Sequence, residues 1–218
     1  MKFLFQRWHE TLTQYDRWLM QDEFSLTWVK ERTQIGILAQ AAGAEGQTMV
    51  LEEYSTNRRK SRKTIPGRAD IYIDRPNGTT LNFEAKFLEM SIAKTQERMT
   101  NQIREKLIDD AMSDCKTLIA DEAGEHIAGL VFIVPYLGKA KGRIYQKAFR
   151  QKCLADFIAC MRNLKDLEAD FIAYHVRAPA LTEKFFSKYR RWVENGLEKD
   201  GPYWEPAMAV AGKYLSKD

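Results

Sequence analysis

The chain has 218 residues, of which 44% are hydrophobic and 29% are charged. This balance excludes an intrinsically disordered protein, and the length suits a single domain with a substantial core. The net charge of +4 is too small to indicate nucleic-acid binding on its own, so the distribution of the charges along the chain matters more.

The cysteines and the hydropathy indicate where the protein is found. Cys115, Cys153 and Cys160 lack metal-ligand spacing, and their odd number favours reduced thiols. The apolar run after Met1 is too short for a signal peptide, and no stretch approaches the ~20 apolar residues of a membrane helix. We therefore expect a cytoplasmic protein with no membrane association.

The first predicted elements are two helices and a strand. Residues 1 to about 21 carry aromatic and leucine side chains at helical spacing. A second helix is predicted from the capping residue Ser25 through about Ala42, ending at Gly43. A strand is predicted over Thr48–Tyr54.

The next two elements form a predicted β-hairpin around the turn Arg75-Pro76-Asn77-Gly78. β-Branched and aromatic residues flank this turn on both sides, which is typical of paired strands. Asp70 lies on the first strand, and Glu84 and Lys86 lie on the second. Because side chains alternate along a strand, Glu84 and Lys86 share one face, which a carboxylate from the first strand can join.

Helices and strands alternate through the second half of the chain. A long amphipathic helix is predicted over residues 92–119, and a strand buried on both faces over 130–135. Another helix is predicted over roughly 142–165, and the last strand over 170–176. The predicted order after the first helix is therefore α, β, β, β, α, β, α, β.

Asp70 followed by Glu84-Ala85-Lys86 resembles the PD-(D/E)xK motif of restriction-endonuclease-like nucleases. Pro66-Gly67-Arg68-Ala69-Asp70 is a loosened form of the first half of that motif, with the proline four residues before the aspartate. Asp114-Cys115-Lys116 also satisfies D/E-x-K, but it lies in a predicted helix without a partner aspartate on a neighbouring strand. The order of predicted elements is the order of the family core.

The resemblance implies an α/β fold with a restriction-endonuclease-like core, a central mixed β-sheet flanked by helices. We expect a single domain, with an N-terminal helix over 1–23, the nuclease-like core over 24–178 and a C-terminal helical extension over 179–218.

The resemblance also implies a Mg²⁺-dependent nuclease that hydrolyses phosphodiester bonds. Asp70 and Glu84 would hold Mg²⁺, or Mn²⁺ as a substitute, and the family pattern adds the backbone carbonyl of Ala85 as a ligand. Mg²⁺ prefers such hard oxygen ligands and keeps several waters, one of which becomes more acidic on the metal. Lys86 would orient the attacking water and offset negative charge in the transition state.

Two further acidic residues are candidates for this site. Glu31 lies on the helix before the first strand, where many nucleases of this family carry an additional glutamate; an ordinary solvated helix residue is the alternative. Glu52, at the end of the first strand, is a candidate metal ligand. Only one of Glu52 and Glu53 can share the face of Asp70, and we expect Glu53 at the surface.

A run of cations precedes Asp70, since five of the six residues from 58 to 63 are Lys or Arg. We predict a loop that lies beside the metal site and contacts the phosphates of a nucleic acid, releasing counterions. A solvated basic loop is the alternative. The candidate contacts are Arg58, Arg59, Lys60, Arg62, Lys63 and Arg68.

The resemblance favours DNA over RNA as the substrate, and no zinc-finger or helix-turn-helix pattern indicates sequence readout. A homodimer or a larger protein complex is a further expectation, because two active sites suit the cleavage of a duplex. The competing function is a catalytically inactive nuclease-like scaffold that binds nucleic acid or a partner protein. A soluble interaction protein with an incidental hairpin is a third alternative.

Overall fold

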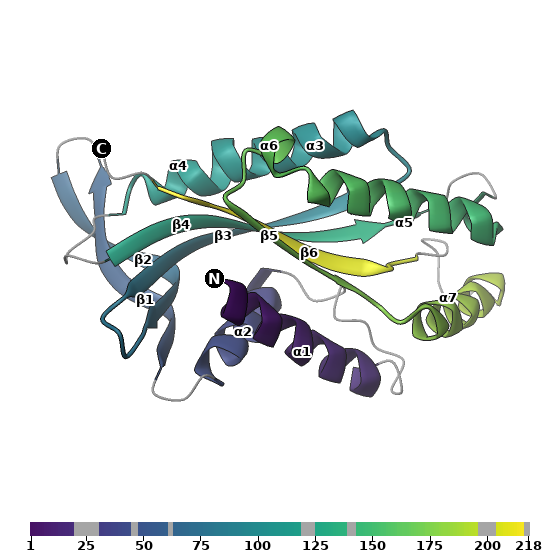
Figure 1. The fold of residues 1–218 in the computed structure, drawn as a ribbon, viewed down its shortest axis with the longest axis horizontal. Helices are drawn as coiled ribbons and strands as arrows, with labels where there is room; N and C mark the ends of the chain where they lie inside the picture. The colour runs from purple at the N-terminus through teal and green to yellow at the C-terminus, as the bar shows by residue number, and fades with distance from the viewer. Residues whose placement is uncertain are drawn as a thin grey trace.

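A mixed six-stranded β-sheet forms the centre of the described structure, with helices on both faces (Figure 1). The computed structural model describes residues 1–19, 31–44, 48–60, 63–118, 125–138, 143–195 and 204–215. The predicted α/β fold with a mixed sheet flanked by helices is confirmed for these residues. The predicted capping residue Ser25 lies outside the described residues.

The sheet has the strand order β1-β2-β3-β4-β6-β5. Only β3 and β4 pair in parallel, and the other neighbouring strands are antiparallel. The strands are β1 (Met49–Lys60), β2 (Lys63–Asp74), β3 (Thr80–Ser91), β4 (Glu125–Tyr136), β5 (Phe171–Val176) and β6 (Ala207–Tyr214).

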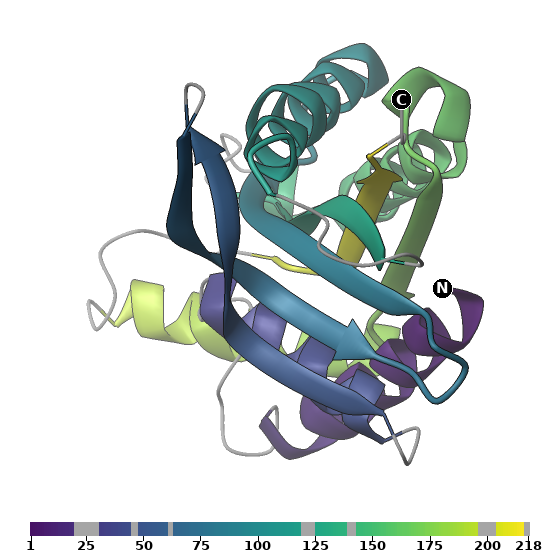
Figure 2. The same ribbon diagram turned by 90° about the vertical axis from the view of Figure 1, so that its left-hand side faces the viewer.

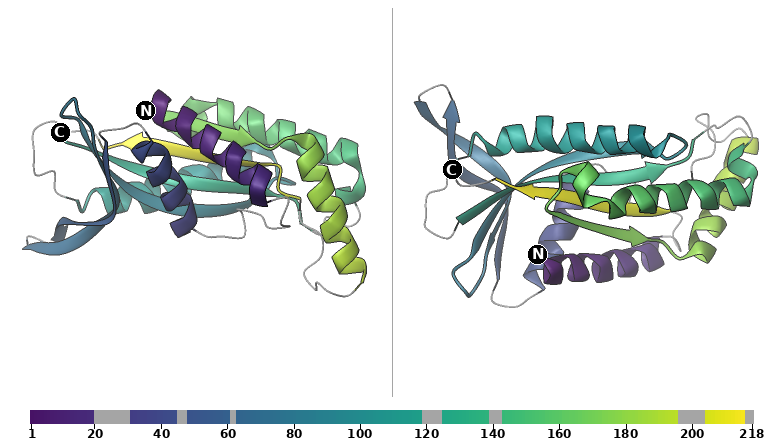
Figure 3. Two further views of the ribbon diagram at one scale, coloured as in Figure 1. Left: turned by 90° about the horizontal axis from the view of Figure 1, so that it is seen from below. Right: turned by 45° about the horizontal axis from the view of Figure 1, so that its top comes forward.

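The helical segments are α1 (Lys2–Leu19), α2 (Glu31–Gly43), α3 (Gln96–Glu105), a π-helical stretch (Lys106–Ala111), α4 (Met112–Cys115), a 3₁₀ turn (Arg143–Tyr145), α5 (Lys147–Arg162), α6 (Leu164–Leu167) and α7 (Pro179–Glu194). Helices α1 and α2 lie on one side of the sheet and α3 to α6 on the other, while α7 lies at one end of the sheet (Figure 3). The helix that begins at Gln96 is capped by the Thr95 hydroxyl, which accepts a hydrogen bond from the backbone N–H of Arg98.

Two large hydrophobic cores fill the space between the sheet and these helices, and a smaller third cluster lies beside α4. On one face, Val131 and Ile133 of β4 pack with residues of α3 and α5, such as Ile103 and Phe157. On the other face, β4 and its neighbours pack with residues of α1 and α2. Adjacent β4 residues therefore enter opposite cores, which explains the continuous apolar run that predicted a strand buried on both faces.

The basic segment between the first two strands is not the predicted loop. β1 and β2 stay paired beyond the sheet, from Thr56 opposite Gly67 to Lys60 opposite Lys63. We call residues 55–60 and 63–69 the β1–β2 ribbon, which rises beside α4 in Figure 2. Its side chains are mostly polar and exposed. The sequence therefore lacks the alternation of apolar and polar residues that would have predicted these strands.

The strand over 170–176 is not the last one, and residues 179–218 are not only a helical extension. β6 lies between β4 and β5 in the sheet, so the C-terminal segment supplies an inner strand of the central sheet. Both faces of β6 are covered, so its sequence of mostly small residues shows no alternation of apolar and polar side chains that would predict a strand. A side chain at Gly212 would overlap the ring of Phe171, which shows how closely β5 and β6 pack there.

The long helix predicted over 92–119 is shorter, beginning at Gln96 and ending at Cys115, with the π-helical stretch in between. None of the described helices is long and apolar enough to cross a membrane.

A buried polar cluster attaches α1 to the end of β5. Asp16 is 5% exposed, and its Oδ2 lies 2.8 Å from His175 Nε2, while its Oδ1 accepts a hydrogen bond of 3.0 Å from Arg177 Nε. Arg177 also donates to the backbone carbonyl of Glu205 at 3.1 Å. His175 therefore has a structural role, as part of the contact between the N-terminal helix, β5 and the segment before β6.

Candidate active site

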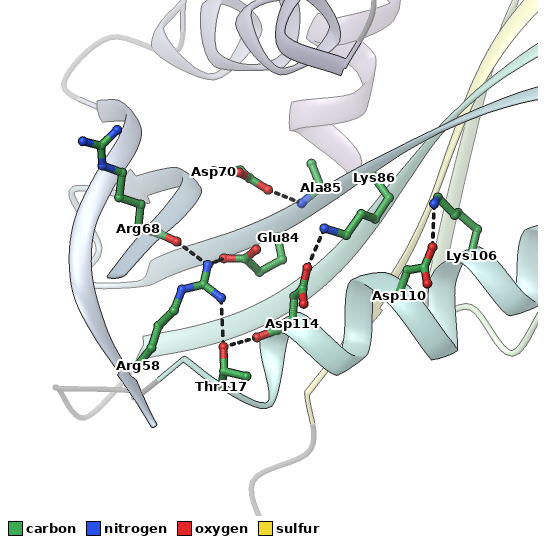
Figure 4. Close-up of polar contacts among 10 residues, drawn as sticks. All are labelled: Arg58, Arg68, Asp70, Glu84, Ala85, Lys86, Lys106, Asp110, Asp114 and Thr117. Carbon is green, nitrogen blue, oxygen red and sulfur yellow. Dashed lines mark hydrogen bonds and ion pairs between the residues drawn. The ribbon is translucent and has the colours of Figure 1, made fainter. Parts of the chain in front are cut away.

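Strands β2 and β3 separate at the position of Asp70. Their last paired residues are Ile71 and Phe83, and Asp70 lies just beyond this pair. Its Oδ2 accepts a hydrogen bond of 2.7 Å from the backbone N–H of Ala85 (Figure 4). A carboxylate therefore takes the place of a main-chain acceptor, directly beside the segment that carries Glu84 and Lys86.

Glu84 is only 3% exposed, and its Oε1 lies 2.5 Å from the guanidinium of Arg58. Burial raises the pKa of Glu84 to about 7, the nearby charge of Asp70 adds to the rise, and Arg58 opposes it. Burial also raises the pKa of Asp70, although the Ala85 hydrogen bond and the charge of Lys86 counteract it. Two carboxylates thus lie close enough to repel each other in a poorly solvated site.

Lys86 points from β3 toward α4, where its Nζ lies 2.5 Å from Asp114 Oδ2 (Figure 4). Burial alone would lower the pKa of Lys86, but the bond to Asp114 and its charge, together with Asp70 and Glu31, raise it. The ammonium group is therefore held charged among three carboxylates.

Glu31, the first residue of α2, also lies at this site. Burial raises its pKa, the charge of Asp70 raises it further, and Lys86, Lys106 and a hydrogen bond with the backbone of Phe87 lower it. Glu31 therefore lies within electrostatic reach of both Asp70 and Lys86. Glu31 is thus the residue of α2 that interacts with the carboxylate and the ammonium group at the gap between β2 and β3.

Glu52 is not brought to the site. It pairs with Ile71, which packs into the core beneath α1 and α2, and its Oε1 lies next to Gly36 of α2. The neighbouring Glu53 adopts a positive φ of 51° and forms ion pairs with Arg32 and Arg68. Directly paired residues of neighbouring strands share a face, so Glu52 lies on the face of Ile71 and not on that of the preceding residue, Asp70. The expectation that Glu52 shares the face of Asp70 is therefore wrong.

Sequence reasoning missed the acidic residue that contacts Lys86. In the sequence, Asp114 stands out only as part of the alternative D/E-x-K motif. Lys106, Asp110 and Asp114 follow one another at intervals of four, and Lys106 forms an ion pair of 2.5 Å with Asp110. Charged residues at intervals of four lie on one side of a helix. This spacing is the signal in the sequence that could have indicated Asp114 as part of a charged helix face.

The basic residues of the β1–β2 ribbon divide into two groups. Arg58 turns inward to Glu84, and Arg68 binds Glu53 at 2.9 Å. Arg68 is nevertheless exposed, as are the others that the structure describes, Arg59, Lys60 and Lys63. Arg62 lies outside the described residues.

Within the described ranges, no group of three or more His, Cys, Asp or Glu side chains is arranged to hold a metal ion. Comparisons of the chain with protein-family models, with curated proteins and with solved structures find no match in any of the three.

The raised pKa of Glu84 predicts a pH-dependent penalty to stability. In the unfolded chain Glu84 ionises near pH 4.5, whereas in the folded protein it holds its proton up to about pH 7. The stability that protonated Glu84 contributes is therefore fully present below the pKa of the unfolded chain, 4.5, and is lost as the pH rises through the folded pKa of about 7. We expect Glu84→Gln to gain stability relative to wild type, by on the order of 2 kcal/mol, between about pH 5 and about pH 8.

Urea unfolding of both proteins at the two pH values measures this gain. Glu89→Gln is the matched control, because Glu89 lies on the same strand and is exposed. A difference between Glu84→Gln and wild type that stays constant with pH would contradict the prediction.

Proposed function

We propose that this protein is a Mg²⁺-dependent nuclease with a restriction-endonuclease-like core, which hydrolyses phosphodiester bonds in DNA. The observation that carries the proposal is the gathering of Asp70, Glu84 and Lys86 where β2 and β3 separate. Glu31 from α2 and the cationic β1–β2 ribbon adjoin the same point. Carboxylates, an ammonium group and a basic approach surface are the groups that phosphodiester hydrolysis requires.

The residues present suit a divalent cation. Burial raises the pKa of both Asp70 and Glu84, and the charge of Asp70 raises the pKa of Glu84 further. A cation between the two carboxylates would offset this repulsion. Together with the Ala85 carbonyl they would supply three oxygen ligands for Mg²⁺, or for Mn²⁺ in its place. When bound, Mg²⁺ supplies polarisation of the phosphate and a bound water of lowered pKa.

The chain's own residues supply the remaining functions. Lys86, held charged by Asp114, would orient the attacking water and offset the charge that develops on the phosphate. Glu31 would hold a water on the side of the site nearest α2. Arg59, Lys60 and Lys63 would contact the DNA backbone, and the affinity would fall as salt increases.

A specific observation favours the competing function, a scaffold that binds nucleic acid or a partner protein without cutting. Glu84 and Lys86 each have an ion-pair partner within the chain, Arg58 and Asp114. In a scaffold these pairs would be permanent, whereas in an enzyme at least the first must open to admit a cation.

Cleavage assays with plasmid and single-stranded DNA separate the two functions. We expect cleavage with Mg²⁺, none with EDTA, and none by Glu84→Gln, which retains the shape of the side chain. DNA binding without cleavage under all conditions would favour the scaffold. Cleavage by Glu84→Gln at the wild-type rate would contradict the proposed site.

We expect Asp70→Asn to weaken Mg²⁺ binding at least tenfold with little change in fold stability. The amide oxygen of asparagine can still accept the hydrogen bond from Ala85, but it lacks the charge that attracts the cation. Calorimetry measures the affinity, and thermal melts measure the stability. Asp74→Asn on the same strand is the control, and equal Mg²⁺ affinities of Asp70→Asn and wild type would exclude Asp70 as a ligand.

A further inference from the structure

Arg58 differs from the other cations of the β1–β2 ribbon in where its guanidinium lies. It forms an ion pair of 2.5 Å with Glu84 Oε1 and donates a hydrogen bond of 2.8 Å to Thr117 Oγ1. It also donates to the backbone carbonyl of Arg68 (Figure 4). These partners come from β3, from the residue that follows α4 by two positions and from β2, so the guanidinium lies where three parts of the fold meet.

The surrounding structure is shaped for this side chain. Gly67 leaves room for the stem of Arg58, because a Cβ at that position would lie 2.4 Å from the Arg58 Cγ and Cδ atoms. Thr117 is itself held by a hydrogen bond of 2.7 Å to the Asp114 carbonyl. The backbone N–H of Arg59 donates to the Thr117 carbonyl at 2.6 Å, which attaches the ribbon to the end of α4.

The guanidinium and a divalent cation would compete for the same carboxylate. Glu84 is 3% exposed, and the Oε1 atom that faces Arg58 belongs to one of the two carboxylates proposed to hold Mg²⁺. Two positive groups on one buried carboxylate repel each other strongly, since the surroundings screen them poorly. Arg58 must therefore leave Glu84, at least in part, before a cation binds with full affinity.

A phosphate group is the partner that best replaces Glu84 for Arg58. Guanidinium groups bind phosphate oxygens through paired, charge-assisted hydrogen bonds. The exposed Arg59, Lys60 and Lys63 on the same ribbon would bring a phosphodiester backbone to Arg58. Nucleic acid bound to the ribbon can thus remove the competing charge from Glu84.

We infer that Arg58 makes the binding of nucleic acid and of the divalent cation cooperative, and this inference rests on the proposed function. In the free protein Arg58 pairs with Glu84 and weakens cation binding. In the complex it pairs with a backbone phosphate, and Glu84 becomes available. By thermodynamic linkage, the cation strengthens nucleic-acid binding by the same factor.

Calorimetric titration of Ca²⁺ into the full chain, alone and saturated with a short DNA duplex, tests this coupling. Ca²⁺ takes the same oxygen ligands as Mg²⁺ with looser geometry, which allows binding to be measured without relying on cleavage. For the wild type we expect about tenfold tighter Ca²⁺ binding in the presence of the duplex. For Arg58→Ala we expect tight Ca²⁺ binding without the duplex and no further gain with it.

Two more variants test the coupling even if Arg58→Ala fails to fold. Arg59→Ala removes a neighbouring ribbon cation that does not contact Glu84, so it should weaken duplex binding and retain the coupling. Thr117→Val removes one hydrogen-bond partner of Arg58 with little change in volume, so it should strengthen Ca²⁺ binding without the duplex.

The outcomes separate this inference from the proposed function. Ca²⁺ affinity that is the same with and without the duplex in the wild type would overturn the coupling and leave the metal site intact. Weaker Ca²⁺ binding by Arg58→Ala than by wild type in the absence of the duplex would also overturn it. No Ca²⁺ binding by any variant under either condition would contradict the proposed metal site, and the coupling with it.

Discussion

Replacing Lys86 by alanine is expected to reduce Mg²⁺-dependent DNA cleavage by about 10²–10³-fold, the usual cost of removing one group that stabilises transition-state charge. Lys86 is partly buried and its pKa is raised by Asp114, so its charge is available at neutral pH. It is not a proposed cation ligand, and it lies apart from the exposed ribbon. Cation and DNA affinities should therefore change much less than the rate.

Single-turnover cleavage rates at saturating Mg²⁺, with DNA affinities measured in parallel, test this expectation. Lys152→Ala is the matched control, because Lys152 is an exposed lysine on α5 whose ion pair with Asp156 lies on one helix surface. It should cleave like the wild type. A cleavage rate of Lys86→Ala within a few-fold of wild type would remove Lys86 from the proposed mechanism.

Asp16→Ala is expected to destabilise the fold by about 3–5 kcal/mol, the effect of removing one partner from a buried ion pair. Asp16 is the partner of Arg177, which is 4% exposed, and of His175. Its loss would remove the nearer carboxylate from the buried Arg177 charge and leave the longer ion pair of 3.9 Å with Glu205. Because the cluster joins α1 to β5, the N-terminal helix should detach before the rest of the fold unfolds.

Denaturant unfolding and hydrogen exchange of the α1 amides measure this effect. Asp16→Asn should cost less than Asp16→Ala, because the amide oxygen can still accept a hydrogen bond. Asp156→Ala, which breaks an exposed ion pair, should cost no more than about 0.5 kcal/mol. A free energy of unfolding for Asp16→Ala close to that of wild type would show that the cluster does not hold α1.

Where local periodicity exists, the elements could be predicted from the sequence. The hairpin of Asp70, Glu84 and Lys86 follows from alternating side chains around a strong turn signal, and the strand containing Leu130 follows from its continuous apolar run. The polar β1–β2 ribbon and the small residues of β6 carry no such period, so pairing with distant strands determines them.

The candidate site likewise has one part that follows from the local sequence and another that depends on the tertiary structure. Spacing of two along one strand is enough to place Glu84 and Lys86 on a common face, so the sequence alone determines this part of the site. The exclusion of Glu52, the contact of Asp114 with Lys86 and the contact of Arg58 with Glu84 depended on strand register and helix packing. Such contacts join residues that are far apart in the chain, and local pattern carries no information about which distant group will face a given side chain.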